Sequence, residues 1–310
     1  MGTIRQPMHA LRLSPAAYRR VTLLALAALA FIIVTGAAVR LTGSGLGCPD
    51  WPTCSENRIV APVEYHAMVE FVNRTVTGLV SVLVILAVLG SLLRVPRRRD
   101  LVWLSLGMVA GVIGQIVLGG LTVLFDLKPG FVMAHFLLSM VLLATAVVLH
   151  ERAGDEEAPA AGRVRISDGD LRLLGKLDVV AAGFVLFLGT VVTSSGPHGG
   201  DEKAERFDFA LRDVARLHGL AAFVFLVLVL LTLWRLWSAK APPATLRRGE
   251  VVLAVSVAQA AIGYAQYFTG VPALLVGFHI VGAVAVWTAT LRFWLSFGRA
   301  APVRDQPSNR

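Results

Sequence analysis

Eight long apolar segments follow one another along the chain, separated by short polar stretches. Each segment approaches the roughly 20 residues that a helix needs to cross about 30 Å of hydrocarbon. The apolar runs are continuous and do not alternate with polar residues, which excludes the strands of a membrane barrel. The pattern therefore predicts an all-α polytopic membrane protein, with spans near residues 21–40, 67–93, 101–125, 131–150, 175–194, 213–237, 250–268 and 273–297.

Four polar residues near the starts of the even-numbered segments repeat at a nearly fixed distance. His135 and His279 are 144 residues apart, and Asn73 and His218 are 145 residues apart. Each of the four lies about one to two helical turns inside its segment, so we expect all four to share one depth in the membrane. The repeat predicts two related halves.

The domain organisation follows from this repeat. We expect an N-terminal four-helix bundle at residues 1–150, a linker at 151–173 and a C-terminal four-helix bundle at 174–310. Ile113-Gly114-Gln115 echoes the segment Ile262–Gln266, which has the same Ile-Gly pair followed by a glutamine. Because each half has an even number of spans, the halves should be parallel and related by a pseudo-two-fold axis along the membrane normal.

Histidines inside membrane spans indicate haem binding. A polar imidazole in a span is costly unless it has a partner, so such a residue is functional by default. Facing imidazoles on two helices of a bundle are a common way to hold a haem iron. The sequence predicts one complete pair of this kind, His218 with His279. The alternative is that each histidine is only hydrogen-bonded to a neighbouring helix.

The matching site in the first half is altered, because Asn73 stands where the repeat places a histidine. Asparagine is a poor ligand for haem iron, which leaves two alternatives. Either His135 is the only protein ligand and one iron position is open, or His66, seven residues before Asn73, takes its place. We favour His135 alone, because His66 would lie about 10 Å away along the helix axis.

The first loop on the side opposite the termini contains Cys48 and Cys54, the two cysteines of the chain. A disulfide between them is reasonable on an oxidising face of the membrane. It is either a structural link or a redox-active dithiol. Two thiols without a histidine in the loop make a poor metal site.

A charged pair opens the second segment. Glu70 and Arg74 are four residues apart, a favourable spacing for an ion pair on a helix, and Glu70 shares a face with Asn73. A carboxylate in a membrane helix beside a haem site is a candidate acid, base or nucleophile. The alternative is an ion pair that neutralises Arg74 or lets it bind a haem propionate.

Composition and charge agree with a membrane setting. The chain is 56% hydrophobic and 16% charged, with a mean hydropathy of +0.70. Lysine and arginine gather in alternate loops and at both ends, which predicts that both termini are cytoplasmic. The net charge of +9 therefore reflects topology and not nucleic-acid binding. The first segment is long and lacks a cleavage site, so we expect a retained span, and the absence of a transit peptide favours a bacterial plasma membrane.

The motifs together resemble the bacterial haem A synthase family over essentially the whole chain. The Glu70–Arg74 segment resembles that family's Glu-x-x-His-Arg motif, with Asn73 in place of the histidine. The first outer loop is similar to the family's corresponding loop in the run Gly43-Ser44-Gly45-Leu46-Gly47-Cys48-Pro49-Asp50-Trp51-Pro52-Thr53-Cys54.

The resemblance implies an oxidoreductase that converts the C8 methyl of haem O to the formyl of haem A by successive hydroxylations, and so supplies haem A to terminal oxidases. It implies a resident haem b, with its iron, on His218 and His279, and a substrate haem O in the first half. It also implies roles for a further set of residues: Glu70 as the catalytic carboxylate, His135, Asn73 and Arg74 at the substrate haem, and a Cys48–Cys54 disulfide. Expected partners are haem O, membrane lipid, haem O synthase, oxidase assembly factors and a second copy of the chain.

A b-type cytochrome that only transfers electrons is the alternative to the enzyme, because the histidine pair suffices for it. Glu70 and the cysteine loop favour the enzyme, since electron transfer needs neither. A transporter is a weaker third interpretation, because the chain lacks the proline-broken paired helices that often mark transporter sites.

Overall fold

The computed structural model describes residues 12–55, 58–154 and 168–298. These residues form an all-helical structure with eight helices long and apolar enough to cross a membrane. Each helix contains its predicted span apart from one or two residues at the ends of the third and the last, so the prediction of an all-α polytopic protein is confirmed. The helices are α1 (Pro15–Leu41), α2 (Tyr65–Leu93), α3 (Arg99–Leu124), α4 (Pro129–Ala153), α5 (Gly169–Ser195), α6 (Leu211–Ser238), α7 (Pro243–Phe268) and α8 (Ala273–Leu295).

Local sequence explains where several helices begin. Pro15, Pro129 and Pro243 occupy the first turn of α1, α4 and α7, where a proline costs no hydrogen bond and its fixed φ suits the helix. Ser14 caps α1 by accepting a hydrogen bond from the backbone N–H of Ala17 at 3.2 Å. Of the helices that carry the repeated polar residues, α4 begins in this way, which fixes how far along it His135 lies.

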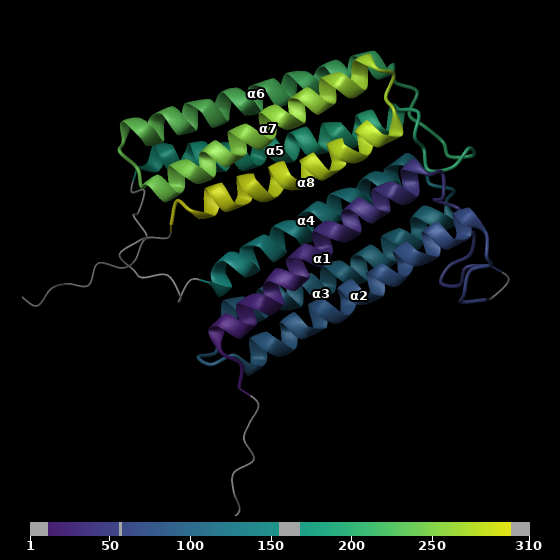
Figure 1. The fold of residues 1–310 in the computed structure, drawn as a ribbon, viewed down its shortest axis with the longest axis horizontal. Coiled ribbons are helices and arrows are strands. Elements are labelled where there is room, and N and C mark those ends of the chain that lie inside the picture. Colours follow the sequence, from purple (N-terminus) through teal and green to yellow (C-terminus); the bar gives the residue numbers. More distant parts are fainter. Residues whose placement is uncertain (1–11, 56–57, 155–167, 299–310) are drawn as a thin grey trace, which may run out of the picture.

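The helices pack as two groups of four, α1–α4 and α5–α8, which lie side by side (Figure 1). In the first group, α1 and α3 each pack against both α2 and α4. In the second group, α5 and α7 each pack against both α6 and α8. Across the described ranges, the backbones of α2 and α4 do not pack directly on each other, and neither do those of α6 and α8. The even-numbered helices are therefore diagonal partners, with side chains between their backbones.

Contacts between the two groups run along the whole length of the molecule. At the end with the long loops, Arg40 donates to the backbone carbonyl of His198 at 2.6 Å. In the middle, the Trp287 indole N–H donates to the Met140 carbonyl at 3.0 Å. At the other end, Glu151 of α4 pairs with residues of the second group, Arg248 at 3.1 Å and Arg292 at 2.7 Å. The groups are thus joined at both membrane faces and between them.

The stretch 151–173 is shorter as a linker than we expected. Helix α4 continues to Ala153 and α5 begins at Gly169, so both helices extend into it, and residues 155–167 lie outside the described part of the chain. The assignment of separate roles to residues 1–150 and 174–310 stays a prediction.

Candidate functional site

His218 of α6 and His279 of α8 face each other across the second group. Their ring centroids are 6.2 Å apart and the ring planes are inclined by 70°. Two imidazole–metal bonds of about 2 Å each, together with roughly 1 Å from each ring centre to its nitrogen, also span about 6 Å. The spacing of the two rings therefore fits an iron atom held between them, on helices that do not pack directly on each other.

A glycine on the preceding helix orients each histidine ring. Without a side chain there, the ring edge that carries Cε1 and Nδ1 packs directly on the neighbouring helix, and Nδ1 is buried. This leaves Nε2 as the nitrogen available to a ligand. The glycines are Gly119, Gly189 and Gly263, where an added Cβ would lie 3.4, 3.3 and 3.0 Å from the Cε1 atoms of His135, His218 and His279 respectively.

A glutamine contact repeats in the two groups. Gln115 of α3 donates to the backbone carbonyl of His135 at 2.9 Å, and Gln259 of α7 donates to that of His279 at 2.7 Å. The pairs Gln115/Gln259 and Gly119/Gly263 have the same 144-residue spacing as the histidines. The echo that we drew between Gln115 and Gln266 was therefore wrong in register, because it followed a local dipeptide and not the histidine spacing.

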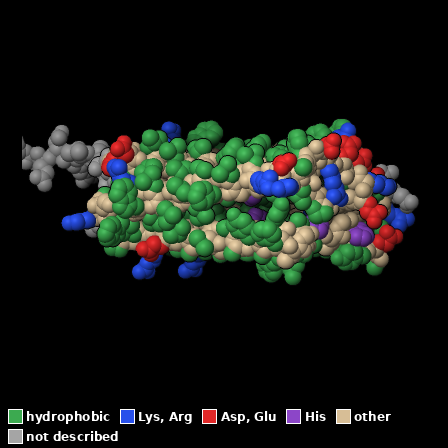
Figure 2. All heavy atoms as spheres, turned by 90° about the horizontal axis from the view of Figure 1, so that it is seen from above, with side chains coloured by type: hydrophobic (Ala, Val, Ile, Leu, Met, Phe, Trp, Pro, Cys, Tyr) green, Lys and Arg blue, Asp and Glu red, His purple; other side chains and the backbone are tan. Residues whose placement is uncertain are grey.

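The four polar residues of the repeat lie at similar positions along their helices. Asn73, His135, His218 and His279 follow the first residue of α2, α4, α6 and α8 by eight, six, seven and six residues. At 1.5 Å per residue this is about 9–12 Å from the helix starts. Figure 2 shows histidine side chains inside a hollow of the largely apolar surface.

Asn73 lies at an opening in the first group. It lines a cavity of about 360 Å³ between α1 and α2, and its Oδ1 accepts a hydrogen bond from the Thr35 hydroxyl at 2.8 Å. The rest of the lining is mostly apolar: Ala38, Val39, Tyr65, Met68, Val69 and Val72. The structure therefore gives Asn73 a partner on α1 that the sequence did not indicate.

His66 is hydrogen-bonded through one of its two ring nitrogens. Its Nδ1 lies 2.9 Å from the Ser44 hydroxyl oxygen, which in turn lies 2.9 Å from the hydroxyl of Thr42. His66 is not among the residues that line the cavity beside Asn73. The Ser44 contact leaves Nε2 of His66 free, and His135 does not line that cavity either, so both alternatives for the first group stay predictions.

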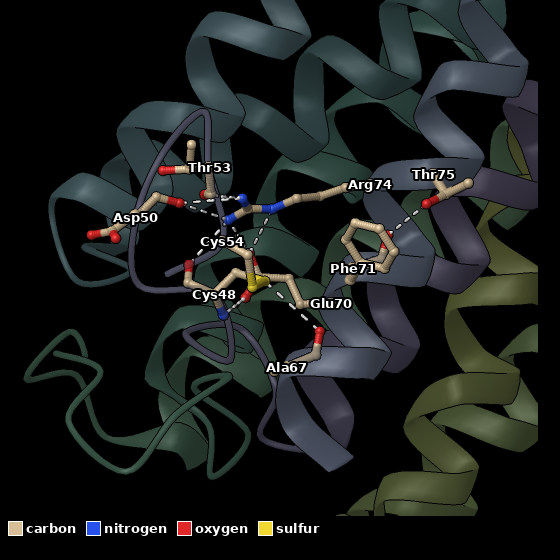
Figure 3. Close-up of a disulfide and its surroundings, with 9 residues drawn as sticks. All are labelled: Cys48, Asp50, Thr53, Cys54, Ala67, Glu70, Phe71, Arg74 and Thr75. Carbon is tan, nitrogen blue, oxygen red and sulfur yellow. Dashed lines mark hydrogen bonds and ion pairs between the residues drawn. A yellow bond between two sulfur atoms is a disulfide. The ribbon is translucent and has the colours of Figure 1, made fainter. Parts of the chain in front are cut away.

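The predicted disulfide is confirmed. Cys48 and Cys54 are bonded, and both are fully buried, with 0% and 1% of their surface exposed. The loop that they close lies directly on α2 (Figure 3), and a Cβ at Gly47 would collide with the backbone of His66 and Ala67. Glycine is needed at position 47 because the loop approaches the helix so closely.

Glu70 and Arg74 lie under this loop. Glu70 is 5% exposed; its carboxylate accepts from the Cys48 N–H at 2.8 Å and from Arg74 Nη2 at 2.6 Å. The Arg74 guanidinium also donates to three loop carbonyls, those of Cys48, Asp50 and Thr53 (Figure 3). Glu70 does not line the cavity beside Asn73. The contacts agree with the ion-pair interpretation, and an acid–base role for Glu70 remains a prediction.

Comparison with known proteins agrees with these features. A profile of the COX15-CtaA family, described as cytochrome oxidase assembly protein, matches residues 19–197. The chain is 29% identical over 136 residues to a protein of Geobacillus thermodenitrificans named heme A synthase, covering 43% of this chain and 42% of that protein. A protein of the same name from Listeria welshimeri is 25% identical over 257 residues, covering 77% of this chain and 82% of that protein. The chain thus aligns with about two fifths of the first relatives and with most of the Listeria protein.

Proposed function

This chain belongs to the COX15-CtaA family of cytochrome oxidase assembly proteins, and from this membership we propose that it is a haem A synthase. In this role it oxidises the C8 methyl of haem O to the formyl of haem A. The observation that carries the proposal is the asymmetry between two otherwise matched sites. His218 has His279 opposite it, whereas His135 has its glycine and glutamine contacts but stands in a group where Asn73 replaces the second histidine.

His218 and His279 would hold the resident cofactor, haem b. Their 6.2 Å ring separation and the glycines behind the rings support this assignment. Bound there, haem b would supply one-electron redox chemistry. The protein's contribution is to fix both imidazoles, through Gly189, Gly263 and the Gln259 amide, before the cofactor arrives.

The first group would take haem O as substrate. His135 is the proposed iron ligand, and a single histidine suits a molecule that must enter and leave. Glu70 is the proposed catalytic carboxylate, since protons leave the methyl carbon during its oxidation. Arg74 donates hydrogen bonds both to Glu70 and to the disulfide loop, so that the loop covers the Glu70 carboxylate.

The remaining assignments follow from the same proposal. The two groups of helices would be related by a pseudo-two-fold axis along the membrane normal. The common 144-residue spacing of a histidine pair, a glutamine pair and a glycine pair supports this relationship. The cysteine loop would face the outside of a bacterial plasma membrane, with both termini in the cytoplasm. Haem O synthase, oxidase assembly factors and a second copy of the chain are proposed partners.

Extraction and chromatographic identification of the haems from protein co-expressed with a haem O source tests the function. We expect haem B together with haem O or haem A. Haem B alone would favour a b-type cytochrome that only transfers electrons.

Two variants sharpen this experiment. His279→Ala should lose haem B, whereas Glu70→Ala should keep haem B and form no haem A. Loss of haem B from Glu70→Ala would show that Glu70 is structural, in line with its contacts to Cys48 and Arg74.

A further inference from the structure

We propose that the Asn73 side of the first-group site is an open coordination face, where the Asn73 amide N–H donates a hydrogen bond to a small ligand on the substrate haem iron, opposite His135. The inference rests on the proposed function, because it requires a haem on His135. It goes further by giving Asn73 a role that a histidine in its place would not have.

Asn73 lies on the face of α2 that points into the group of helices. The residues that follow it at helical spacing on the same face, Val80, Val84 and Ala87, are between 0% and 4% exposed. At the level of Asn73 this packing gives way to the cavity of about 360 Å³. The side chain therefore borders a cavity between α1 and α2 that is large enough for part of a ligand. The position of Asn73 opposite His135 follows from the repeat, in which His218 stands opposite His279.

The orientation of the amide makes Asn73 a donor towards this space. Its Oδ1 already accepts from the Thr35 hydroxyl at 2.8 Å. In the described part of the chain, no group accepts a hydrogen bond from its Nδ2, and Asn73 lines the cavity. A neutral amide oxygen that is engaged by a hydroxyl is a poor iron ligand, whereas the free N–H₂ can stabilise an electron-rich ligand next to it.

The two sides of the site are thus built differently. His135 is held as a ligand, with Gly119 against its ring and Gln115 on its carbonyl, in the manner of His279. The opposite side offers a hydrogen-bond donor at Asn73, and His66 is not among the residues that line the cavity beside it. A haem in the first group would therefore have one free axial position, and a haem on His218 and His279 would have none.

Carbon monoxide and cyanide are the probes for this difference. In reduced protein that carries both haems, we expect carbon monoxide to bind one haem of the two, as seen in the optical difference spectrum. In oxidised protein, cyanide should bind the same haem. Asn73→His should abolish both, because it completes a second bis-histidine pair and gives a low-spin spectrum.

Asn73→Leu distinguishes the effect of the free iron coordination position from the effect of the Asn73 hydrogen-bond donor. The leucine side chain has a similar size but no N–H. Carbon monoxide should therefore still bind, while the cyanide dissociation constant should rise roughly tenfold, as expected for one lost hydrogen bond. Thr35→Val, which frees Oδ1 and lets the amide turn, should give a smaller rise. The haem B content of each variant reports whether the second group has folded.

Two outcomes would overturn the inference. One is wild-type protein that binds neither probe until His66→Leu opens the site, which would make His66 the second ligand. The other is an unchanged cyanide affinity in Asn73→Leu. Haem A formation in the same preparations is a separate readout. Probe binding without haem A contradicts the proposed enzyme and supports the open coordination face. Haem A formation without probe binding supports the enzyme and contradicts the open coordination face.

Discussion

Gln115 and Gln259 make the same contact in the two groups of helices: each side-chain amide donates to the backbone carbonyl of the histidine 20 residues further on. A carbonyl inside a helix already accepts one hydrogen bond from its own helix, and its second lone pair is free for a side chain. The contact therefore fixes the rotation of α4 against α3 and of α8 against α7 at the level of the histidines.

Removing this donor should loosen one histidine without touching it. Gln259→Leu should lower the haem B content or raise its rate of loss by up to about tenfold, since one hydrogen bond to a positioning group is worth about 1 kcal/mol. Haem retention is measured by optical spectra during transfer to apomyoglobin. Gln115→Leu is the matched control, because it should leave haem B in place and weaken only retention of haem O. Equal loss of haem B from both variants would contradict separate sites.

The glycines behind the rings give a steric test. In Gly263→Ala the added methyl would lie 3.0 Å from His279 Cε1, so the ring must shift by a few tenths of an ångström and the spacing of the histidine pair changes. We expect a broadened or shifted haem B spectrum and a lower haem content. Gly107→Ala on α3 is the control, because nothing lies within 4 Å of the new Cβ and alanine favours the helix. A normal haem spectrum in Gly263→Ala would contradict the idea that the glycine sets the ring position.

Much of the fold could be predicted from the sequence, and the reason is physical. Hydrocarbon thickness sets the length of the apolar runs, so every helix was found, with its ends within seven residues of the prediction. Spacing in the chain also revealed the histidines, because they are rare and costly in a membrane. The disulfide was predictable because Cys48 and Cys54 have no other thiol to pair with.

The contacts of the site could not be predicted in the same way. Whether Gln115 or a neighbouring residue reaches His135 depends on helix rotation, which the apolar pattern of a membrane helix records poorly because lipid and core are both apolar. The pairing of Thr35 with Asn73 joins two helices whose relative height no local motif fixes. The position of Glu70 depends on the path of the cysteine loop, and backbone N–H and C=O groups of that loop are its partners.

Arg74 should control the stability of that loop. Its guanidinium joins Glu70 to three loop carbonyls, a geometry that depends on the planar fork of arginine. Arg74→Lys keeps the charge but loses most of these bonds, so the buried Cys48–Cys54 disulfide should become more accessible to a reductant. The rate of thiol labelling under mild reduction should rise at least severalfold. An unchanged rate would mean that loop packing on α2, for example at Gly47, suffices without the arginine.

The ion pairs of Glu151 connect the two groups of helices at the end opposite the loops, and their removal tests how firmly the groups are joined. Glu151 is 17% exposed at its side chain and pairs with Arg248 and Arg292, so Glu151→Gln leaves two guanidinium groups without their carboxylate. A partly buried network of this kind is worth about 1–2 kcal/mol, more than an isolated surface pair. We expect a lower midpoint of thermal unfolding in detergent.

Asp170→Asn is the control, since Asp170 is 80% exposed and 3.9 Å from Arg235, and its loss should have almost no effect. If both variants unfold at the same temperature as the parent protein, the apolar contacts of α4 with α8 and the Trp287–Met140 hydrogen bond hold the groups together without help from charge.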